Sequence, residues 1–344
     1  MVSEQALWPL DLGYRVHGSQ MARALSRAGL QVGIATIEPT PTQIPPELRA
    51  LMLPWPQASP ADRTLWQASC MGWLGLARQR LARFLAPSTQ TLAGLLPLLR
   101  AHRPTTVIGL GLHSPILLKT LQHLPAQAEV PACNTLWYGA DELIDFHLSC
   151  LRQENWRRWP TRLQQLLLHG LLEQLFVRGL DGAIGVSPRD AYLLQRLAGA
   201  RRSILIRNGV DLEHYAPPAP QGQLTTTTDQ ADAPTLAFWG RLSFPPNRDG
   251  VLWFARAVWP TLHARFPHAR WRIAGMDAPA EVLALRDQPG IELLGAVPDV
   301  RPVAHAAQVV VLPMRCGGGI KNKLLEAAAM GAAIAASPVA VAGL

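Results

Sequence analysis

Short apolar runs alternate with amphipathic stretches of helical period along most of the 344-residue chain. The runs have the length of strands, and the stretches between them carry apolar residues at the spacing of a helix face. Strands that alternate with helices build parallel sheets, so we expect an α/β protein. Strands are predicted at 31–36, 105–112, 136–138, 183–186, 204–206, 236–239, 270–274, 291–294, 309–312 and 333–336, and helices at 18–29, 249–265 and 321–330.

A break in composition divides the chain. Residues 216–234 are rich in proline, contain four consecutive threonines from Thr225 to Thr228, and hold almost no large apolar residue. Such a composition is typical of linkers and exposed loops. We therefore expect a first domain at 1–215, a linker or exposed loop at 216–234 and a second domain at 235–344. Because the chain stops just after a strand-like run, the second domain is expected to be incomplete.

Composition and charge narrow the kind of partner. Hydrophobic residues make up 49% of the chain and charged residues 16%, as in a globular protein. The formal net charge of +8 suits an anionic partner, such as a phosphate-bearing ligand, an acidic membrane face or nucleic acid. Zinc-finger spacing, basic-region heptads and an aromatic ribonucleoprotein motif are all missing from the sequence, so we expect no nucleic-acid partner.

The cysteines and the hydropathy pattern bear on location. The sequence has no CxxC pair, and its four cysteines lie far apart, at Cys70, Cys133, Cys150 and Cys316. Neither a disulfide framework nor a zinc site is expected, which favours a reducing compartment. No apolar run reaches the roughly 18–20 residues that span a bilayer, and no secretory signal pattern opens the chain. We expect a cytoplasmic protein, with peripheral association with the inner face of the cytoplasmic membrane left open.

The first candidate for ligand binding follows the strand predicted at 236–239. Gly240 and Arg241 stand at its carboxyl end, and Asn247 lies six residues further on. Ligands of open α/β sheets bind beyond the carboxyl ends of the strands. A glycine there allows close backbone approach, and a guanidinium can clamp a diphosphate through paired hydrogen bonds. A surface turn with a solvated arginine is the alternative, and this element alone does not decide between them.

A glycine-rich loop after the strand predicted at 309–312 gives the stronger signal. Its backbone amides can face a phosphate at the start of the next helix, where the helix dipole adds positive potential. The loop and first turn comprise Gly317, Gly318, Gly319, Ile320, Lys321 and Lys323. Two lysines in a first turn oppose the helix dipole, which is explained if an anion binds there. Glu326, on the same helix, is a candidate acceptor for the hydroxyls of a ribose. The alternative is a glycine-rich turn with a solvated basic helix start.

These motifs resemble the family 4 retaining glycosyltransferases of the GT-B fold. The resemblance rests on Gly240-Arg241-Leu242, the glycine-rich loop ending at Glu326, and Asn208-Gly209-Val210-Asp211. Pro246-Asn247 with Trp253-Phe254, residues 295–302 and the stretch from Gly319 to Lys323 are similar to sugar transferases linked to exopolysaccharide and exosortase gene clusters. The resemblance covers most of the chain and is densest from Asn208 onward.

The resemblance implies two Rossmann-like, doubly wound domains that face a cleft and bind a nucleotide-diphosphate sugar. It also implies retention of the anomeric configuration without a metal or other cofactor, with Arg241 and a loop lysine on the diphosphate and Glu326 on the ribose. We accordingly expect Arg241, Lys321 and His113 to be catalytic. The chain departs from the family at Gly318, where a sugar-contacting glutamate is usual. The family's second phosphate-binding base would fall near Pro246 or Asn247, so Lys321 or Lys323 is left to supply that charge.

The first half holds weaker candidates. Gly13 to Gly18 resembles the glycine loop that GT-B enzymes bring against the donor, and a purely structural turn is the alternative. His113, after the strand predicted at 105–112, corresponds to a donor-sugar contact in the family, although a histidine there often only caps or packs. Asp141 and Glu142 follow another strand end and are candidates for contact with the acceptor.

Tryptophans and arginines interleave at residues 152–162, and a second amphipathic stretch covers 65–85. Tryptophan rings at a lipid boundary with arginines toward anionic headgroups explain this pattern, and so do tryptophans packed into the domain with solvated arginines. The two readings stay open.

Taken together, the sequence predicts a glycosyltransferase that moves a sugar from a nucleotide-diphosphate donor to a glycan or lipid-linked acceptor in polysaccharide biosynthesis. A nucleotide-sugar epimerase of the same fold and a non-catalytic nucleotide-sugar binding protein or fragment are the alternatives.

Overall fold

The computed structural model describes residues 1–3, 5–8, 13–39, 41, 44–69, 92–140, 142–154, 156–217 and 234–344. These residues form two compact units. Unit 1 comprises Met1–Ile144 and Gln165–Arg207, and unit 2 comprises Asp145–Gln164 and Asn208–Leu344. The grouping differs from the expected division in one segment, since residues 145–164 belong with unit 2. Most of the expected linker lies outside the described residues.

Unit 1 is built on a parallel sheet of seven strands in the order β3-β2-β1-β4-β5-β6-β7. Every recorded strand pair in it is parallel. The strands are β1 (Val2–Ser3), β2 (Ile34–Thr36), β3 (Met52–Leu53), β4 (Thr106–Leu110), β5 (Asn134–Ala140), β6 (Gly182–Gly185) and β7 (Ser203–Leu205). The order reverses direction between β1 and β4, as in a Rossmann fold.

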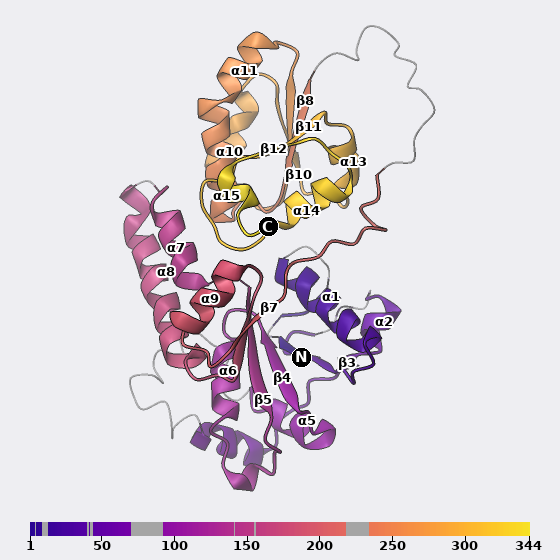
Figure 1. The fold of residues 1–344 in the computed structure, drawn as a ribbon, viewed down its shortest axis with the longest axis vertical. Coiled ribbons are helices and arrows are strands. Elements are labelled where there is room, and N and C mark those ends of the chain that lie inside the picture. The colour runs from indigo at the N-terminus through magenta and orange to yellow at the C-terminus, as the bar shows by residue number, and fades with distance from the viewer. Residues whose placement is uncertain are drawn as a thin grey trace. The chain divides into compact units, whose positions relative to one another are not determined.

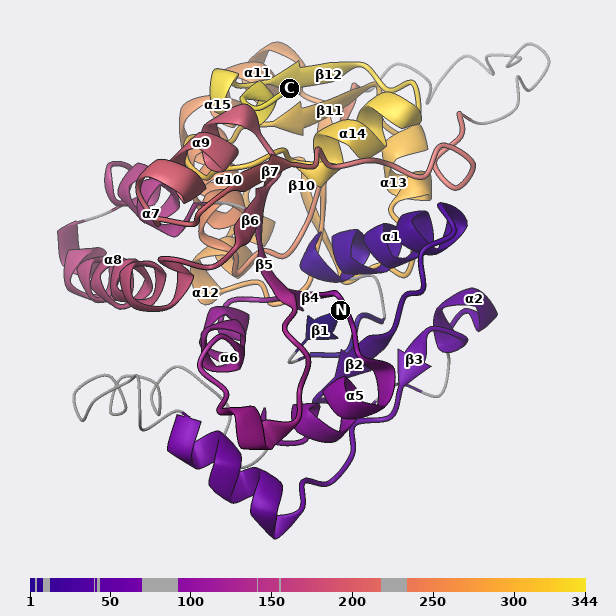
Figure 2. The same cartoon turned by 60° about the horizontal axis from the view of Figure 1, so that its bottom comes forward.

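Both faces of this sheet are buried. Successive residues of one strand enter different apolar clusters: Trp137 packs in one cluster and Tyr138 in the other. Figure 2 shows α1 (Gly13–Arg27) on one face and α5 (Leu95–His102) and α6 (Ser114–Leu121) on the other. The other helical segments in this part of the chain are α2 (Pro46–Arg49), η1 (Ala126–Ala128), α7 (Leu143–Leu151), η2 (Trp156–Arg158), α8 (Trp159–Leu172), the π-helix η3 (Glu173–Val177) and α9 (Pro188–Arg196).

The starts of two helices show how local sequence shapes unit 1. Ser187 is the N-cap of α9, because its hydroxyl accepts a hydrogen bond from the Asp190 amide at 3.1 Å and Pro188 opens the helix. The loop expected from Gly13 to Gly18 is wrong, because α1 already begins at Gly13. A Cβ on Gly18 would lie 3.0 Å from side-chain carbons of Leu7 and Leu110. Gly18 therefore allows the helix to pack closely against the apolar core.

Unit 2 contains a parallel sheet of five strands in the order β10-β9-β8-β11-β12. Counted within the unit this is again the Rossmann order, with the reversal between β8 and β11. The strands are β8 (Thr235–Trp239), β9 (Arg270–Ala274), β10 (Ile291–Gly295), β11 (Val309–Leu312) and β12 (Ile334–Ala336). Figure 1 shows α10 (Pro245–Ala257) and α11 (Trp259–Arg265) along one side of these strands. The remaining helices are α12 (Ala280–Leu283), η4 (Ala284–Asp287), α13 (Arg301–His305), α14 (Asn322–Ala329) and α15 (Pro338–Val341).

The single helix predicted at 249–265 is wrong. The chain forms two helices that meet at Val258, which ends α10 and precedes α11. Pro260 has no amide hydrogen and cannot continue the hydrogen-bond ladder of α10, so the helix is interrupted just before it. Trp259 of α11 and Phe254 of α10 both pack against Trp271 of β9, with ring centroids 6.0 and 4.7 Å away. These contacts bury both helices against the sheet.

Across the described residues, none of the helices combines the length and the apolar character needed to cross a membrane.

Candidate functional site

The candidate donor residues gather where the strand order of unit 2 reverses. Strands β8 and β11 are neighbours in the sheet. Gly240 follows β8 directly, and the glycine-rich loop follows β11 and leads into α14. In doubly wound sheets such a reversal opens a crevice at the carboxyl ends of the two strands, where ligands bind.

Gly240 lies against the side chains that enter from α10 and α14. Its φ of +139° belongs to the region that favours glycine. A Cβ at this position would lie 2.9 Å from Asn247 Nδ2 and 3.3 Å from Lys323 Nζ. The backbone therefore runs close to both polar groups, and only glycine leaves this space open.

Asn247 connects the strand end to the helix. It is 4% exposed, its Nδ2 donates to the Arg241 carbonyl at 2.8 Å, and its Oδ1 accepts from Lys323 Nζ at 2.6 Å. Lys323 Nζ also lies 5.0 Å from the centre of the Phe238 ring. Burial lowers the pKa of Lys323 to about 8. The structure thus brings Gly240, Asn247 and the Lys323 ammonium together.

Lys321 points to a different set of groups. Its Nζ donates to the Gly318 carbonyl and, at 3.4 Å, to the Gly319 carbonyl. The lysine therefore ties the glycine-rich loop to the start of α14. The two lysines that the sequence left as equivalent differ in their contacts.

The first part of the loop is anchored by residues outside it. The Gly317 amide donates to Ser149 Oγ at 3.0 Å, and the Arg315 guanidinium forms a two-point pair with Asp249 at 2.6 and 3.0 Å. The carbonyl of Ile320 accepts a hydrogen bond from Asn208 Nδ2 at 3.0 Å. Gly317 and Gly319 have φ values of +107° and +64°, which the tight course of the loop requires.

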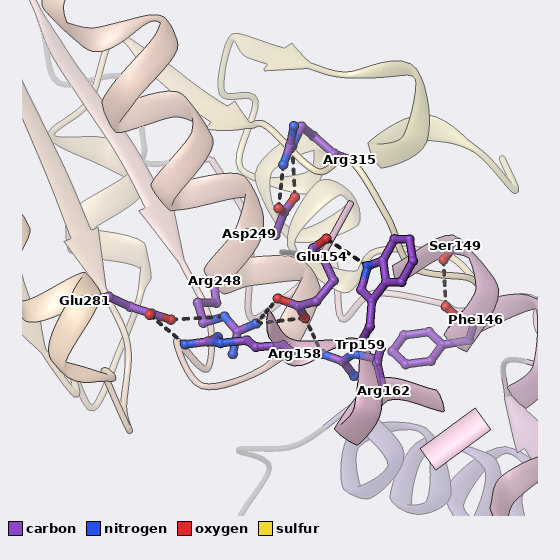
Figure 3. Close-up of polar contacts among 10 residues, drawn as sticks. All are labelled: Phe146, Ser149, Glu154, Arg158, Trp159, Arg162, Arg248, Asp249, Glu281 and Arg315. Carbon is purple, nitrogen blue, oxygen red and sulfur yellow. Dashed lines mark hydrogen bonds and ion pairs between the residues drawn. The ribbon is translucent and has the colours of Figure 1, made fainter. Parts of the chain in front are cut away.

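Residues 145–164 supply one of these anchors, Ser149, and make further contacts within unit 2, a role that no sequence motif indicated. Figure 3 shows Ser149 beside the Phe146 carbonyl, and Glu154 between Arg162 and Arg248. The Phe146 ring stacks on Phe244 with a centroid distance of 5.8 Å.

The thiols of Cys150 and Cys316 are buried and are hydrogen-bonded to each other. Among the described residues there are three cysteines, Cys133, Cys150 and Cys316, and none of them forms a disulfide.

Glu326, the expected ribose acceptor, already receives protein donors. Trp239 Nε1 donates to its Oε2 at 2.7 Å, and the Tyr215 hydroxyl forms a second hydrogen bond to the carboxylate. Burial raises the pKa of Glu326, while these donors act in the opposite direction. A carboxylate has about four acceptor positions, so room remains for further hydroxyls. Sequence reasoning missed Trp239 and Tyr215, because both resemble ordinary apolar packing residues.

Arg241 is held at the surface. Its Nε lies 2.9 Å from Asp277 Oδ2 and 3.0 Å from Ser243 Oγ, and its side chain is about half exposed. An exposed ion pair of this kind contributes only about 0–1 kcal/mol. The guanidinium can therefore exchange Asp277 for a stronger anionic partner at little cost.

Among the unit 1 candidates, His113 is the N-cap residue of α6, and its side chain makes no capping hydrogen bond there. Asp141 lies outside the described residues. Glu142 is 1% exposed and lies against Glu173, to which it is hydrogen-bonded. Burial, followed by this neighbour, raises the pKa of Glu173 to about 9. Glu173 is therefore protonated at neutral pH and donates to Glu142.

In the part of the chain that the structure describes, no group of three or more His, Cys, Asp or Glu side chains is placed to hold a metal ion.

Two parallel sheets, each in Rossmann order, define a protein of the GT-B fold class. Residues 233–344 match the family model described as glycosyl transferases group 1. Comparison with curated proteins gave no match.

Solved structures show the same fold. HepE of Anabaena, in complex with UDP and glucose, is 15% identical with a TM-score of 0.61, covering 98% of this chain and 80% of HepE. Sucrose-phosphate synthase of Thermosynechococcus elongatus is 16% identical with a TM-score of 0.63, covering 98% of this chain and 81% of the synthase. WaaG, a glycosyltransferase involved in lipopolysaccharide biosynthesis, is 14% identical with a TM-score of 0.60, covering 98% of this chain and 80% of WaaG.

Proposed function

We propose that this chain is a retaining glycosyltransferase of family 4 that moves a hexose from a nucleotide-diphosphate sugar to a glycan or lipid-linked acceptor. The match of residues 233–344 to the glycosyl transferases group 1 model supports glycosyl transfer. HepE has been solved with UDP-glucose, which supports a nucleotide-sugar donor. The resemblance to exopolysaccharide-linked transferases favours polysaccharide biosynthesis in the cytoplasm.

One observation carries the proposal. The Lys323 ammonium, the Asn247 amide and the open backbone at Gly240 converge at the strand reversal of unit 2, beside the start of α14. A buried cation is costly, and burial lowers the pKa of Lys323 although the Glu326 carboxylate acts in the opposite direction, so a further anion at this place would be stabilising. A diphosphate is an anion that Lys323, Arg241 and the loop amides are chemically suited to bind.

Each residue then has a definite task. Lys323 and Arg241 neutralise the diphosphate as the bond from the sugar to the phosphate oxygen lengthens and negative charge develops on that oxygen. Fixed positive charge at such a point is usually the largest catalytic contribution. Lys321 keeps the loop in shape, and Glu326 holds the ribose hydroxyls.

The anomeric configuration is retained if the acceptor attacks the anomeric carbon from the same face of the sugar that the diphosphate leaves. The acceptor hydroxyl then forms the new bond to the anomeric carbon and gives its proton to the departing phosphate oxygen. No metal is required in this scheme, because lysine and arginine supply the charge. His113 is proposed to contact the donor sugar, and Asp141 to contact the acceptor.

The test begins with the donor. UDP-, GDP- and ADP-sugars are screened for thermal stabilisation, since a ligand at 100 times its dissociation constant adds about 2.7 kcal/mol to the free energy of unfolding. The donor found is then used to measure sugar transfer by K323A, by R241A and by R256A, which removes an exposed arginine from α10. We expect K323A and R241A to lose roughly a hundredfold or more in kcat/KM and R256A to match the wild type.

Three other results have a clear meaning. Release of a free epimerised sugar without any acceptor identifies an epimerase. Donor binding with no product on any acceptor identifies a binding protein, which the glycine at position 318 would explain. Unchanged transfer in both K323A and R241A overturns the charge-clamp mechanism.

A further inference from the structure

Helix α8 presents a row of apolar side chains to solvent. Trp159, Leu163, Leu167 and Leu171 are spaced four residues apart, which places them on one face of the helix. Their exposed fractions are 48%, 42%, 65% and 45%, and Trp156, in the 3-10 turn before α8, is 71% exposed. These five side chains are called the α8 apolar row below. Single exposed apolar residues are common, but a continuous row of them marks an interaction surface.

The exposure of the two tryptophans bears on the alternatives that the sequence left open. Trp156 and Trp159 do not pack into the protein interior. In the second stretch, by contrast, Trp66 is fully buried, and the remainder of that stretch from residue 70 lies outside the described residues. Among the described residues of the two stretches, the exposed tryptophans belong to the α8 segment.

Helix α8 itself carries no negative charge. The sequence of α8, WPTRLQQLLLHGLL, contains no acidic residue. Exposed arginines at positions 152, 157 and 158 lie just before it, and the Arg157 guanidinium is 5.6 Å from the centre of the Trp156 ring. Figure 3 shows that Arg158 and Arg162 are directed to Glu281 and Glu154. Arg152 and Arg157 are both exposed and place positive charge at the tryptophan end of the row.

This arrangement fits a lipid surface better than a protein partner. Leucines along one helix face suit the boundary of the acyl chains, and tryptophans are favoured at headgroup level. Arginines beside those tryptophans attract anionic headgroups. The chain as a whole carries a formal charge of +8, which adds long-range attraction to such a surface.

We propose that the α8 apolar row docks on an anionic lipid bilayer, with α8 lying in the plane of the interface and Arg152 and Arg157 at the headgroups. The proposal does not depend on glycosyl transfer. It assigns the surface on which this protein meets a membrane and would place the chain beside a lipid-linked acceptor.

The experiment is co-sedimentation of the full chain with vesicles of phosphatidylcholine alone and of phosphatidylcholine with phosphatidylglycerol, without any sugar donor. We expect binding to the phosphatidylglycerol vesicles and a strong loss in L163Q/L167Q, by about tenfold or more. The matched control is L30Q/L212Q, which changes two leucines that are 57% and 68% exposed elsewhere. This control is expected to bind as the wild type does.

A second pair of variants tests the charge. R152E/R157E and R256E/R286E both take the formal net charge from +8 to +4, since each pair removes two positive and adds two negative charges. Each arginine near an anionic surface contributes about fivefold in affinity, so R152E/R157E is expected to lose about twentyfold or more. R256E/R286E, with its exposed arginines in other parts of unit 2, should lose far less.

Several outcomes overturn the proposal. Absence of binding to phosphatidylglycerol vesicles does so, and so does equal binding by the row variants and their matched controls. Sedimentation velocity of each variant shows whether a second copy occupies the row, since a dimer that L163Q/L167Q abolishes would replace the lipid surface. Circular dichroism establishes that each variant is folded. Because no donor is present, the outcome is separate from that of the proposed transfer reaction.

Discussion

Lys323 is the residue whose charge matters most to the proposed donor site. Its pKa is lowered to about 8 by burial, so it loses its proton within the range of ordinary assays. We expect the affinity of the free enzyme for the donor to fall as pH rises through about 8. In K323R the charge persists, because an arginine side chain does not titrate in this range. Donor dissociation constants measured from about pH 6 to about pH 10 should show the fall in the wild type only.

The matched control for this prediction is K321R, since Lys321 contacts loop carbonyls and not the Asn247 side chain. It should keep the wild-type pH dependence. If K321R removes the fall and K323R retains it, the roles given to the two lysines are reversed.

A second prediction at this scale concerns Glu173. Its pKa is raised from 4.5 to about 9, so the folded protein holds a proton that the unfolded chain releases above its ordinary pKa. The contribution of Glu173 to the free energy of unfolding is fully present below about pH 4.5 and is lost as pH rises toward about 9. We expect the melting temperature of E173Q to fall less than that of the wild type between about pH 5 and about pH 9.

E47Q serves as the comparison for Glu173, because Glu47 is a largely exposed carboxylate of unit 1 that pairs with Arg23. It should follow the wild-type melting curve across pH. An identical pH slope in E173Q and the wild type would mean that Glu173 is already ionised in the folded protein.

At the scale of elements, the segment 145–164 is secured to α10 mainly by one carboxylate. Glu154 accepts from Arg248 through both oxygens at 3.1 Å and from Arg162 at 3.0 Å, and all three side chains are largely buried. Removing the charge takes away the carboxylate that the two largely buried guanidinium groups share, although Arg248 keeps Glu281 at 3.3 Å. We expect E154Q to lower the free energy of unfolding by about 3 kcal/mol in chemical denaturation.

The contrasting substitution is E292Q. Glu292 also pairs with two arginines, Arg270 and Arg272, but it lies on the partly exposed edge strand β10. Exposed pairs contribute about 0–1 kcal/mol, so this loss should be small. Equal losses in E154Q and E292Q would show that the burial of Glu154 adds nothing.

Most of the helices and strands could be predicted from the sequence. The strands predicted at 270–274 and 309–312 match β9 and β11 residue for residue, because β11 (VVVL) is a short β-branched apolar run and β9 (RWRIA) alternates arginine with apolar residues before Ala274. The sequence predicts one helix across Val258, because the helical period of the apolar residues continues through this position. Pro260 is the residue that indicates the break. The glycines at positions 13 and 18 favour a loop, but the helical period extends through them and α1 begins at Gly13.

The candidate site could be predicted from the sequence only in part. Gly240 and the glycine-rich loop have residue types that point to phosphate chemistry, and both lie at the expected strand ends. The contact of Lys323 with Asn247 joins positions 76 residues apart, and that of Gly317 with Ser149 joins positions 168 apart. Nothing in local composition encodes such pairs, because they depend on how the strands are ordered in the sheet.

At the scale of the whole molecule, the chain contains two sheets with separate cores. One apolar cluster is confined to unit 2 and includes Trp259 and Trp271, while two clusters cover the faces of the unit 1 sheet. Units with their own cores commonly unfold in separate steps, so a single two-state transition is not expected.

Scanning calorimetry of the intact chain should therefore resolve two transitions. E154Q should lower only the transition of unit 2, because Glu154 and its arginine partners belong there. The pH effect of E173Q should appear only in the transition of unit 1. A nucleoside diphosphate at saturating concentration should raise the unit 2 transition, since ligand binding stabilises the unit that holds it. One cooperative transition that every variant and the nucleotide shift together would show that the two cores depend on each other for stability.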